Sequence, residues 1–230
     1  MTKVRMLIAI GAIACSLTFA ADKDVRHRVQ AAGMERVPFP QNGVLHLQHA
    51  TGDVTVEVCD CQEVEVAMVK HAKVIADLDK IHITTQSHGD EVLVTTDFPR
   101  HTAFPPSSPL GPARRFDLEY RITAPRNARL TIEHDVGEVH IDDIRGDIRA
   151  TSLQGAIILH LPENGQYSID AKSDYGAVNS DFAGRQKRSP WVFGVRFVQE
   201  TSGASQKLYL RIGYGDIVIL KTQIPALPGK

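Results

Sequence analysis

The feature that most constrains the fold is a short, glycine-started repeat at Val136–Pro162. Divided into nines, the sequence here reads GEVHIDDIR, GDIRATSLQ and GAIILHLPE, with Gly137, Gly146 and Gly155 opening the three units. Apolar and polar residues alternate inside each unit, which predicts half-buried β-strands. Glycine suits a corner before each strand, where the chain takes a positive φ or approaches a neighbour closely. Because a unit this short cannot bury its apolar face alone, it must stack on its neighbours.

The repeat aligns apolar residues into columns that we expect to point into the core. The first column is Val139, Ile148 and Ile157, the second is Ile141, Ala150 and Leu159, and the third is Ile144 and Leu153. A β-sandwich does not need successive strands to match in this way, whereas a stack of strands does. The pattern therefore favours an all-β, single-domain β-solenoid, or β-helix-like stack, over the alternative of a β-sandwich.

The repeat belongs to one expected domain at residues 43–221, in which short strands recur about every ten residues. Five prolines within residues 99–112 predict a surface loop, and residues 184–206 form a basic and aromatic insertion. Residues 21–42 read as a polar leader followed by a first short strand, and residues 222–230 as a C-terminal tail.

Two local patterns add to this outline. Glu35–Phe39 is the expected first strand. Val74, Ile75 and Leu78 fall at helical spacing, which predicts one or two helical turns within His71–Lys80.

The N-terminus has the organisation of a secretory signal peptide, expected at residues 1–20. Lys3 and Arg5 precede an apolar run at Met6–Ala14, and small residues favour cleavage after Ala20. A lipoprotein anchored at Cys15 is the less favoured alternative, because alanine stands where a large aliphatic residue is usual, three positions earlier. We therefore expect a periplasmic or extracellular protein.

Charge and hydropathy argue against two classes of partner. The formal net charge of the full sequence is −1, and removal of Lys3 and Arg5 would make it −3. This balance does not favour nucleic acid or an anionic membrane surface. No apolar stretch after the signal approaches about 20 residues, so we expect no transmembrane segment in the mature chain.

Cys59 and Cys61 are the cysteines that remain after the expected cleavage. Export places them in an oxidising compartment, and side chains two apart on a strand lie on one face. We predict an intramolecular disulfide, against free or metal-bound thiols.

The insertion at residues 184–206 carries the most unusual surface signal. As an exposed hairpin it could dock a protein partner, a glycan or a membrane leaflet. The candidate recognition residues are Arg185, Lys187, Arg188, Trp191, Phe193 and Phe197. The apolar residues of the insertion alternate, however, and the interpretation that we favour is that they cap an open end of the stack.

Acidic and imidazole side chains on the outer face of the repeat suggest two further sites. Glu138, His140 and Asp142 alternate along one strand, just after Glu133, His134 and Asp135. They could bind a metal ion, but residues two apart on a strand are about 6.6 Å apart, so neighbouring units would have to supply ligands. A solvated polar face explains them more simply, and we predict no metal or cofactor site.

The carboxylates of Asp142, Asp143 and Asp147 could serve a polysaccharide-degrading enzyme. Exposed acids are expected on any soluble strand, and no recognisable nucleophile or phosphate-binding motif accompanies them. Arg145-Gly146-Asp147 spells an integrin-binding tripeptide, but the repeat register already accounts for its glycine and its acid. We expect no catalytic residues.

Several segments together resemble a bacterial exported family labelled putative adhesin. They are TGDVTVEV, EVEVAMVK, FDLEYRITAPRNARLTI, the glycine-started series, GAVNSDF and KLYLRIGYGDIVIL, within Gly43–Lys221. The resemblance implies a β-helix-like fold and export, and supplies no established active site. The Cys-Asp-Cys corner and the long insertion depart from the family pattern.

These observations predict an exported, non-catalytic binding or cell-envelope structural module, whose partner is an unidentified envelope protein or glycan. The alternatives are an envelope carbohydrate-active enzyme and a periplasmic metal-binding protein.

Overall fold

The computed structural model describes residues 29–72, 78–79, 81–97, 116–188 and 194–222, and the part it describes is built almost entirely of β-strands. The strands are β1 (Val29–Pro38), β2 (Val44–Thr51), β3 (Asp53–Cys59), β4 (Glu63–Ala72), β5 (His82–His88), β6 (Glu91–Asp97), β7 (Phe116–Pro125), β8 (Arg129–Asp142), β9 (Ile148–Pro162), β10 (Tyr167–Tyr175), β11 (Val178–Ser180), β12 (Arg185–Arg188), β13 (Val195–Gln199) and β14 (Gln206–Thr222). In these ranges no helix is long and apolar enough to cross a membrane.

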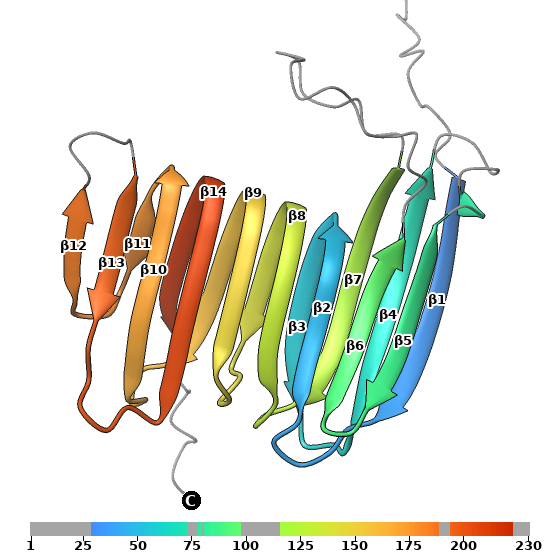
Figure 1. The fold of residues 1–230 in the computed structure, drawn as a ribbon, viewed down its shortest axis with the longest axis horizontal. Coiled ribbons are helices and arrows are strands. Elements are labelled where there is room, and N and C mark those ends of the chain that lie inside the picture. The colour runs from blue at the N-terminus through green and yellow to red at the C-terminus, as the bar shows by residue number, and fades with distance from the viewer. Residues whose placement is uncertain (1–28, 73–77, 80, 98–115, 189–193, 223–230) are drawn as a thin grey trace, which may run out of the picture.

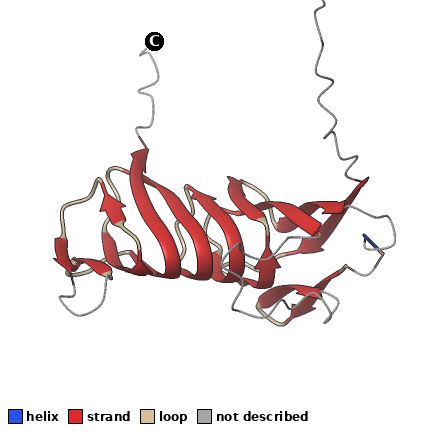
Figure 2. Cartoon of the chain, turned by 90° about the horizontal axis from the view of Figure 1, so that it is seen from above, coloured by secondary structure: helices blue, strands red, loops and turns tan. Residues whose placement is uncertain are grey.

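All fourteen strands are linked by hydrogen bonds into one sheet that does not close on itself (Figure 1). The long strands β8, β9 and β14 bend in the middle, so each contributes to two facing layers (Figure 2). The first layer runs β5, β6, β2, then the first halves of β8, β9 and β14, and then β10, β13 and β12. The second layer runs β1, β4, β7, β3, then the second halves of β8, β9 and β14, and then β11.

The central strands pair in parallel and in register, but not in chain order. The last strand, β14, lies between β9 and β10 and pairs in parallel with both. Leu208 is therefore level with Ile148 on one side and with Ile169 on the other. The chain leaves this position open after β9 and fills it with β14, the last strand of the described ranges.

The register corrects the predicted columns. Val139 lies opposite Ile157, eighteen residues later, whereas Ile148 lies opposite Leu130 in the first layer. One nine-residue unit spans a single layer, so two units are needed before the chain returns to the same position. All three predicted first-column residues are buried, but they do not form one column.

The predicted third column is also wrong. Ile144 is fully buried, whereas Leu153 is 59% exposed. The two residues lie at different corners of the path, Ile144 after β8 and Leu153 within β9.

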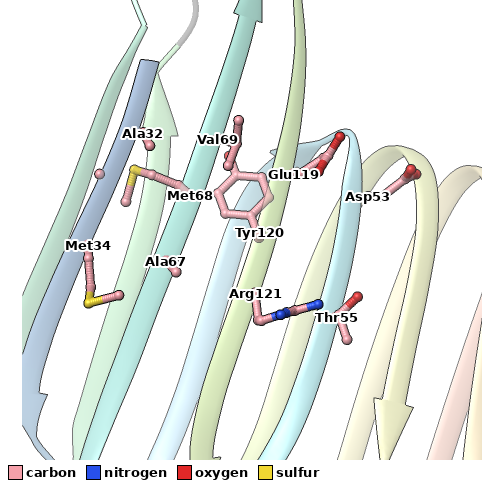
Figure 3. A pocket seen from close by; sticks show the side chains of 11 residues that line it. Ala32, Met34, Asp53, Thr55, Ala67, Met68, Val69, Glu119, Tyr120 and Arg121 are labelled. Atoms are coloured by element: carbon pink, nitrogen blue, oxygen red, sulfur yellow. The ribbon is translucent and has the colours of Figure 1, made fainter. Parts of the chain in front are cut away.

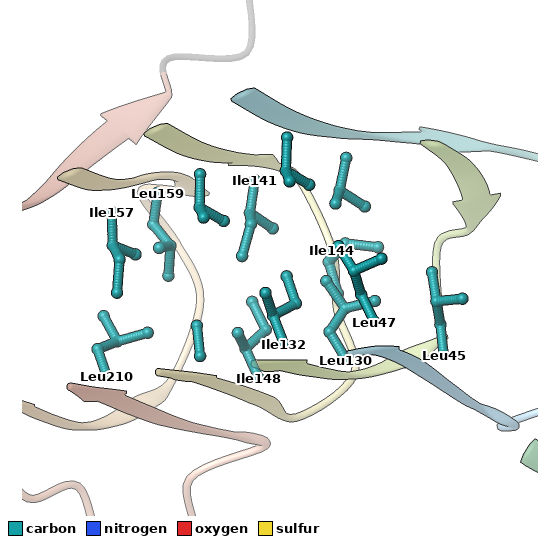
Figure 4. Packing of buried hydrophobic residues seen from close by; sticks show 14 of the residues in the cluster. Leu45, Leu47, Leu130, Ile132, Ile141, Ile144, Ile148, Ile157, Leu159 and Leu210 are labelled. Atoms are coloured by element: carbon teal, nitrogen blue, oxygen red, sulfur yellow. The ribbon is translucent and has the colours of Figure 1, made fainter. Parts of the chain in front are cut away.

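The core fills the space between the two layers. Ile141, Ile157 and Leu159 project from the second layer toward Ile132, Ile148 and Leu210 of the first (Figure 4). Each buried aliphatic side chain of this size contributes roughly 1.5–3 kcal/mol relative to exposure. Alternation along the strands, as in the second half of β9, places these side chains inward and their neighbours outward.

The two layers meet at a stack of glycines that we call the corner glycines: Gly52, Gly137, Gly155, Gly215 and Gly176, in spatial order. Gly155 has a φ of +130°, and a Cβ added to it would lie 1.7 Å from the carbonyl oxygen of Gly137. Any larger residue would meet this oxygen, so glycine is required for both conformation and close approach. Gly146, which opens the middle unit of the repeat, lies instead against the backbone of Ala128 at the opposite corner.

The first strand is longer than predicted. β1 begins at Val29 and pairs antiparallel with β4 along its whole length. Residues 30–36 are exposed, so backbone hydrogen bonds at the edge of the sheet hold this strand rather than an apolar face. The first half of β1 lacks an alternation of apolar and polar residues, so it could not be predicted from the sequence.

Two other predictions fall largely outside the described residues. The proline-rich loop at 99–112 lies wholly outside them. Of the predicted helical residues, Leu78 is described and is buried, and its carbonyl accepts a hydrogen bond from the amide of Ile81.

We predict that Gly155→Ala destabilises the protein by at least about 3 kcal/mol, because the new methyl group overlaps the backbone of Gly137. Gly203→Ala is the matched control: its φ is also positive, at +74°, but nothing lies within 4 Å of the added atom. The control should cost about 1 kcal/mol from backbone strain alone. Equal losses in urea titrations would contradict the role of close packing at the corner.

We predict that Ile148→Asp costs several kcal/mol, because it places an unpaired carboxylate in the core, where Ile148 is 1% exposed. The adjacent Arg149 is exposed, and Arg149→Asp should change the free energy of unfolding by no more than about 0.5 kcal/mol. Similar effects of the two substitutions in chemical denaturation would show that the inward and outward assignment is wrong.

Candidate binding surfaces

A shallow groove of about 660 Å³ crosses the outer surface of the second layer (Figure 3). Small residues on β1 and β4, such as Ala32, Gly33 and Ala67, leave the space open, and Met34 beside them is 60% exposed. Arg121 of β7 extends toward β3 at the far wall. The groove is mixed in character, with apolar residues at one end and charged residues at the other.

Tyr120 lies beneath this groove and joins the two layers. Its ring is buried, and its hydroxyl is hydrogen-bonded to the hydroxyl of Thr96 in β6. Burial raises the pKa of Tyr120 to about 12, and the hydrogen bond with Thr96 offsets part of this rise. The hydrogen bond satisfies two polar groups inside the core.

A second surface is strongly cationic and lies on the outside of the first layer, near the end formed by β9, β14, β10, β13 and β12. We call it the basic face, and its members are Arg149, Lys172, Arg185, Lys187, Arg196, Lys207 and Arg211. Register places Arg211, Lys172, Arg196 and Lys187 side by side on four adjacent strands. Like charges directly opposite one another on a sheet are destabilising, so this row costs folding free energy.

Asp170 compensates part of that charge. It accepts two hydrogen bonds from Arg196, at 2.9 and 2.8 Å, and one from Arg211 at 2.8 Å. Partial burial alone would raise the pKa of Asp170, but these hydrogen bonds and charges hold it below its usual value. Lys172 pairs with Asp174 at 2.6 Å.

Tyr209 lies between two arginines on this face. The guanidinium carbon of Arg211 is 3.8 Å from the ring centroid, and that of Arg149 is 4.6 Å from it. Such cation–π contacts orient long side chains that would otherwise move freely. In the described part of the chain, Arg149, Arg185, Lys187 and Lys207 have no carboxylate partner.

Two further aromatic residues are exposed on the same strands. Tyr175 and Tyr214 precede the corner glycines of β10–β11 and β14, and are 47% and 54% exposed. Their rings are stacked, with centroids 4.7 Å apart and planes 7° apart. They lie three residues beyond Lys172 and Arg211 along the two strands.

The residues of the insertion that were predicted for recognition do not all lie on one exposed surface. Arg185, Lys187 and Arg188 form the exposed strand β12, and Trp191 and Phe193 lie outside the described residues. Phe197 was expected on the recognition surface, but it is only 6% exposed. Its side chain points inward from β13 and packs over Gly184, because Phe197 alternates with the outward-facing Arg196.

Cys59 and Cys61 lie at the end of β3, in the turn toward β4. The structure joins them as a disulfide, with Cα atoms 5.3 Å apart. They line a polar hollow together with Asp60, which pairs with Arg126 at 3.7 Å. The oxidation state of the exported protein stays a prediction.

Two of the three carboxylates that suggested catalysis, Asp142 and Asp147, have structural partners. Asp147 accepts a hydrogen bond of 2.7 Å from the amide of Lys207, across the corner to β14. Asp53 accepts one from the amide of Glu138, and Asp216 one from the amide of Ala177, on the neighbouring strands at the glycine corner. The acidic side chain that follows the glycine in each of these units therefore accepts a hydrogen bond from a backbone amide, at a position where the hydrogen bonding between strands is interrupted.

The histidines of the candidate metal face are also paired with neighbours. His140 contacts Glu138 at 3.0 Å, and His160 of β9 contacts Asp142. His134 is buried and donates a hydrogen bond of 2.8 Å from Nε2 to the carbonyl of Gly52. Within the described ranges, no group of three potential ligands has the geometry to hold a metal ion.

Sequence reasoning did not find most of the basic face. Four of its members come from strands that are distant in the sequence: Arg149, Lys172, Arg196 and Arg211. Lys207 lies on the same strand as Arg211. Period-two alternation could have marked each as outward-facing. Only the spatial order, with β14 between β9 and β10, brings them together.

Comparison with solved structures identifies a protein of similar fold. A putative cell adhesion protein from Clostridium sporogenes ATCC 15579 aligns over 84% of this chain and 100% of that chain, with 13% identity and a TM-score of 0.53. The chain shares the fold of that protein. No protein-family model matches the chain, and no curated protein sequence matches it significantly.

Two other structures are more distant. Putative adhesins from Bacteroides fragilis NCTC 9343 and Parabacteroides distasonis ATCC 8503 have 9% and 8% identity and TM-scores of 0.23 and 0.25. Each alignment covers 83% of this chain and 97% of the other chain. TM-scores this low do not demonstrate a common fold.

We predict that stability falls between pH 9 and pH 11 because of Tyr120. The folded-state pKa of about 12 lies above the ordinary value of 10.0, so the contribution of this group is present below pH 10 and lost as the pH rises toward 12. The loss by pH 11 is about 1 kcal/mol in urea titrations.

Tyr120→Phe should remove this part of the pH dependence, although it lowers stability at both pH values by leaving Thr96 without its partner. Tyr175→Phe is the matched control, because Tyr175 is exposed. If Tyr120→Phe and Tyr175→Phe both retain the full pH dependence of the original protein, burial of Tyr120 is not its cause.

Proposed function

We propose that the chain is an exported, non-catalytic binding module of a bacterial cell envelope. The observation that carries the proposal is the use of the outward carboxylates: Asp147 and Asp216 hold backbone amides of neighbouring strands, while a set of cations on the basic face has no internal partner. Side chains engaged in holding the scaffold are poorly suited to acid–base chemistry, whereas unpaired exposed charges suit recognition. The fold shared with a putative cell adhesion protein supports the same reading.

The proposal includes a β-solenoid architecture. Parallel pairing of β8, β9, β14 and β10, with the corner glycines level with one another, is the arrangement that stacked repeats produce. A β-sandwich is built mainly from antiparallel neighbours. Antiparallel pairs here lie toward the ends of the sheet, such as β1 with β4 and β12 with β13.

Export is supported by the signal-like sequence at residues 1–20, which lies outside the described residues. An envelope location would also give the disulfide of Cys59 and Cys61 an oxidising environment. The rigid stack would then present its outer surfaces to an envelope component.

The competing function is an envelope carbohydrate-active enzyme. It would require Asp142 or Asp147 to act on substrate, although Asp142 is paired with His160 and Asp147 with the amide of Lys207. The two proposals differ in a directly measurable way, since only the enzyme converts its ligand.

The test uses residues 21–230, incubated with an envelope fraction of the organism that encodes the chain. We expect saturable binding that is unchanged within about twofold by Asp142→Asn, and no release of reducing sugars from envelope polysaccharides. Absence of saturable binding would contradict the module. Release of reducing sugars that is abolished by Asp142→Asn or Asp147→Asn would establish the enzyme instead.

A further inference from the structure

The basic face is the strongest unexplained feature of the molecule. Seven cations gather there, although the whole chain carries a formal net charge of −1. Continued across β8, β2 and β6, the row through Arg149 contains Thr131, His46 and Leu93, and the row through Arg211 contains Glu133, Gln48 and Thr95. The positive charge is therefore confined to one end of the first layer.

The outer side of the second layer does not share this character. Glu119, Asp53, Glu138 and Asp216 project from its outer side on or near one level of the strands. A general excess of basic residues therefore does not explain the basic face. Asp170 and Asp174 pair with three cations of the row, whereas Lys187 of the row and Arg149, Arg185 and Lys207 beside it have no acidic partner in the described part of the chain, and an external anion would supply one.

The geometry of the face selects an extended ligand. Adjacent strands are about 4.8 Å apart, so the row from Arg211 to Lys187 spans about 15 Å of flat surface. A small anion would be held by one or two side chains, whereas a chain with repeated negative groups could engage several of the cations on this face that have no acidic partner. Arginine is suited to carboxylate because its planar guanidinium can donate two parallel hydrogen bonds.

The exposed tyrosines point to a sugar polymer. Tyr175 and Tyr214 lie at the glycine corner that borders the basic face, about 10 Å along the strands from Lys172 and Arg211. Stacked, exposed aromatic rings with polar hydroxyls can pack against the apolar faces of pyranose rings while their hydroxyl groups hydrogen-bond to the sugar. A membrane surface would instead favour apolar residues among the cations, and the rows of the basic face contain only Val198 of this kind.

We propose that the basic face, together with Tyr175 and Tyr214, binds a linear polysaccharide that carries carboxylate groups. The polymer extends over the basic face to the two tyrosines at the corner, and its carboxylates pair with cations that lack an internal partner. This inference rests on the proposed binding function and names its ligand class.

The test measures binding of residues 21–230 to polygalacturonate at about 0.15 M salt. We expect saturable binding that weakens as salt is raised, because exposed charge pairs are screened. Arg149→Gln with Lys187→Gln should weaken binding about tenfold. The matched control is Arg36→Gln with Lys221→Gln on the second layer, which likewise removes one arginine and one lysine, at residues that are 59% and 33% exposed, and should leave binding unchanged.

A second pair of variants tests the same face with different residues. Arg185→Gln with Lys207→Gln should also weaken binding about tenfold. Melting curves of all variants should match that of the original protein, because these side chains are exposed or partly exposed. Equal weakening by the control pair, or no weakening by either basic-face pair, would overturn the proposal.

The tyrosines are tested with two polyanions. Tyr175→Ser with Tyr214→Ser should weaken binding of polygalacturonate but not of poly-glutamate, which has carboxylates and no sugar rings. Tighter binding of single-stranded DNA, or of vesicles containing anionic phospholipid, than of polygalacturonate would overturn the assignment of the ligand. Binding to the envelope fraction without any binding to polygalacturonate would refute the proposed ligand but not the proposed binding function. Absence of binding to the envelope fraction and to polygalacturonate would refute both proposals.

Discussion

At the corner between the two layers, the carbonyl oxygen of Gly137 occupies the space where a Cβ of Gly155 would lie. The same contact recurs between Gly155 and Gly215, and between Gly215 and Gly176. Because a strand can approach this closely only with its glycine level with the next one, the contact fixes the register of the whole stack. Register in turn decides which side chains face the core, since a shift of one residue would exchange the two faces of a strand.

Polar side chains complete the corner on both sides. Inside, His134 donates a hydrogen bond to the carbonyl of Gly52, and Ser173 donates one of 2.7 Å to that of Gly215. Outside, Asp53 and Asp216 accept hydrogen bonds from amides that the ladder leaves unpaired. These groups stabilise the scaffold. The proposed recognition surface must therefore use other charged side chains, and several of these lie on the basic face.

The sequence was sufficient to predict strands, glycine corners and the inward position of residues such as Val139 and Ile157, because alternation and glycine placement are local properties. It was insufficient for the path of the chain. The nine-residue period concealed the fact that Ile148 belongs to the opposite layer, since both layers use the same alternation. No local signal could place β14 between β9 and β10, which depends on contacts between residues far apart in the sequence.

The same limit applied to the candidate site. Basic and aromatic residues close together in the sequence marked the insertion, yet Phe197 of that group faces the core. Arg149 and Arg211 were not predicted to belong to a site, because each is an ordinary outward-facing residue of its own strand. Their meeting around Tyr209 follows from register alone.

The central claim is that in-register stacking at the corner glycines holds the rest of the structure together. Amide hydrogen exchange, resolved by residue, measures this most directly, because the amides of the most stable unit exchange only on global unfolding. The account predicts the slowest exchange in β8, β9 and β14 on both sides of Gly137, Gly155 and Gly215, and faster exchange in the edge strands β1 and β12. Uniform protection of all strands, or fastest exchange at the corner, would contradict it.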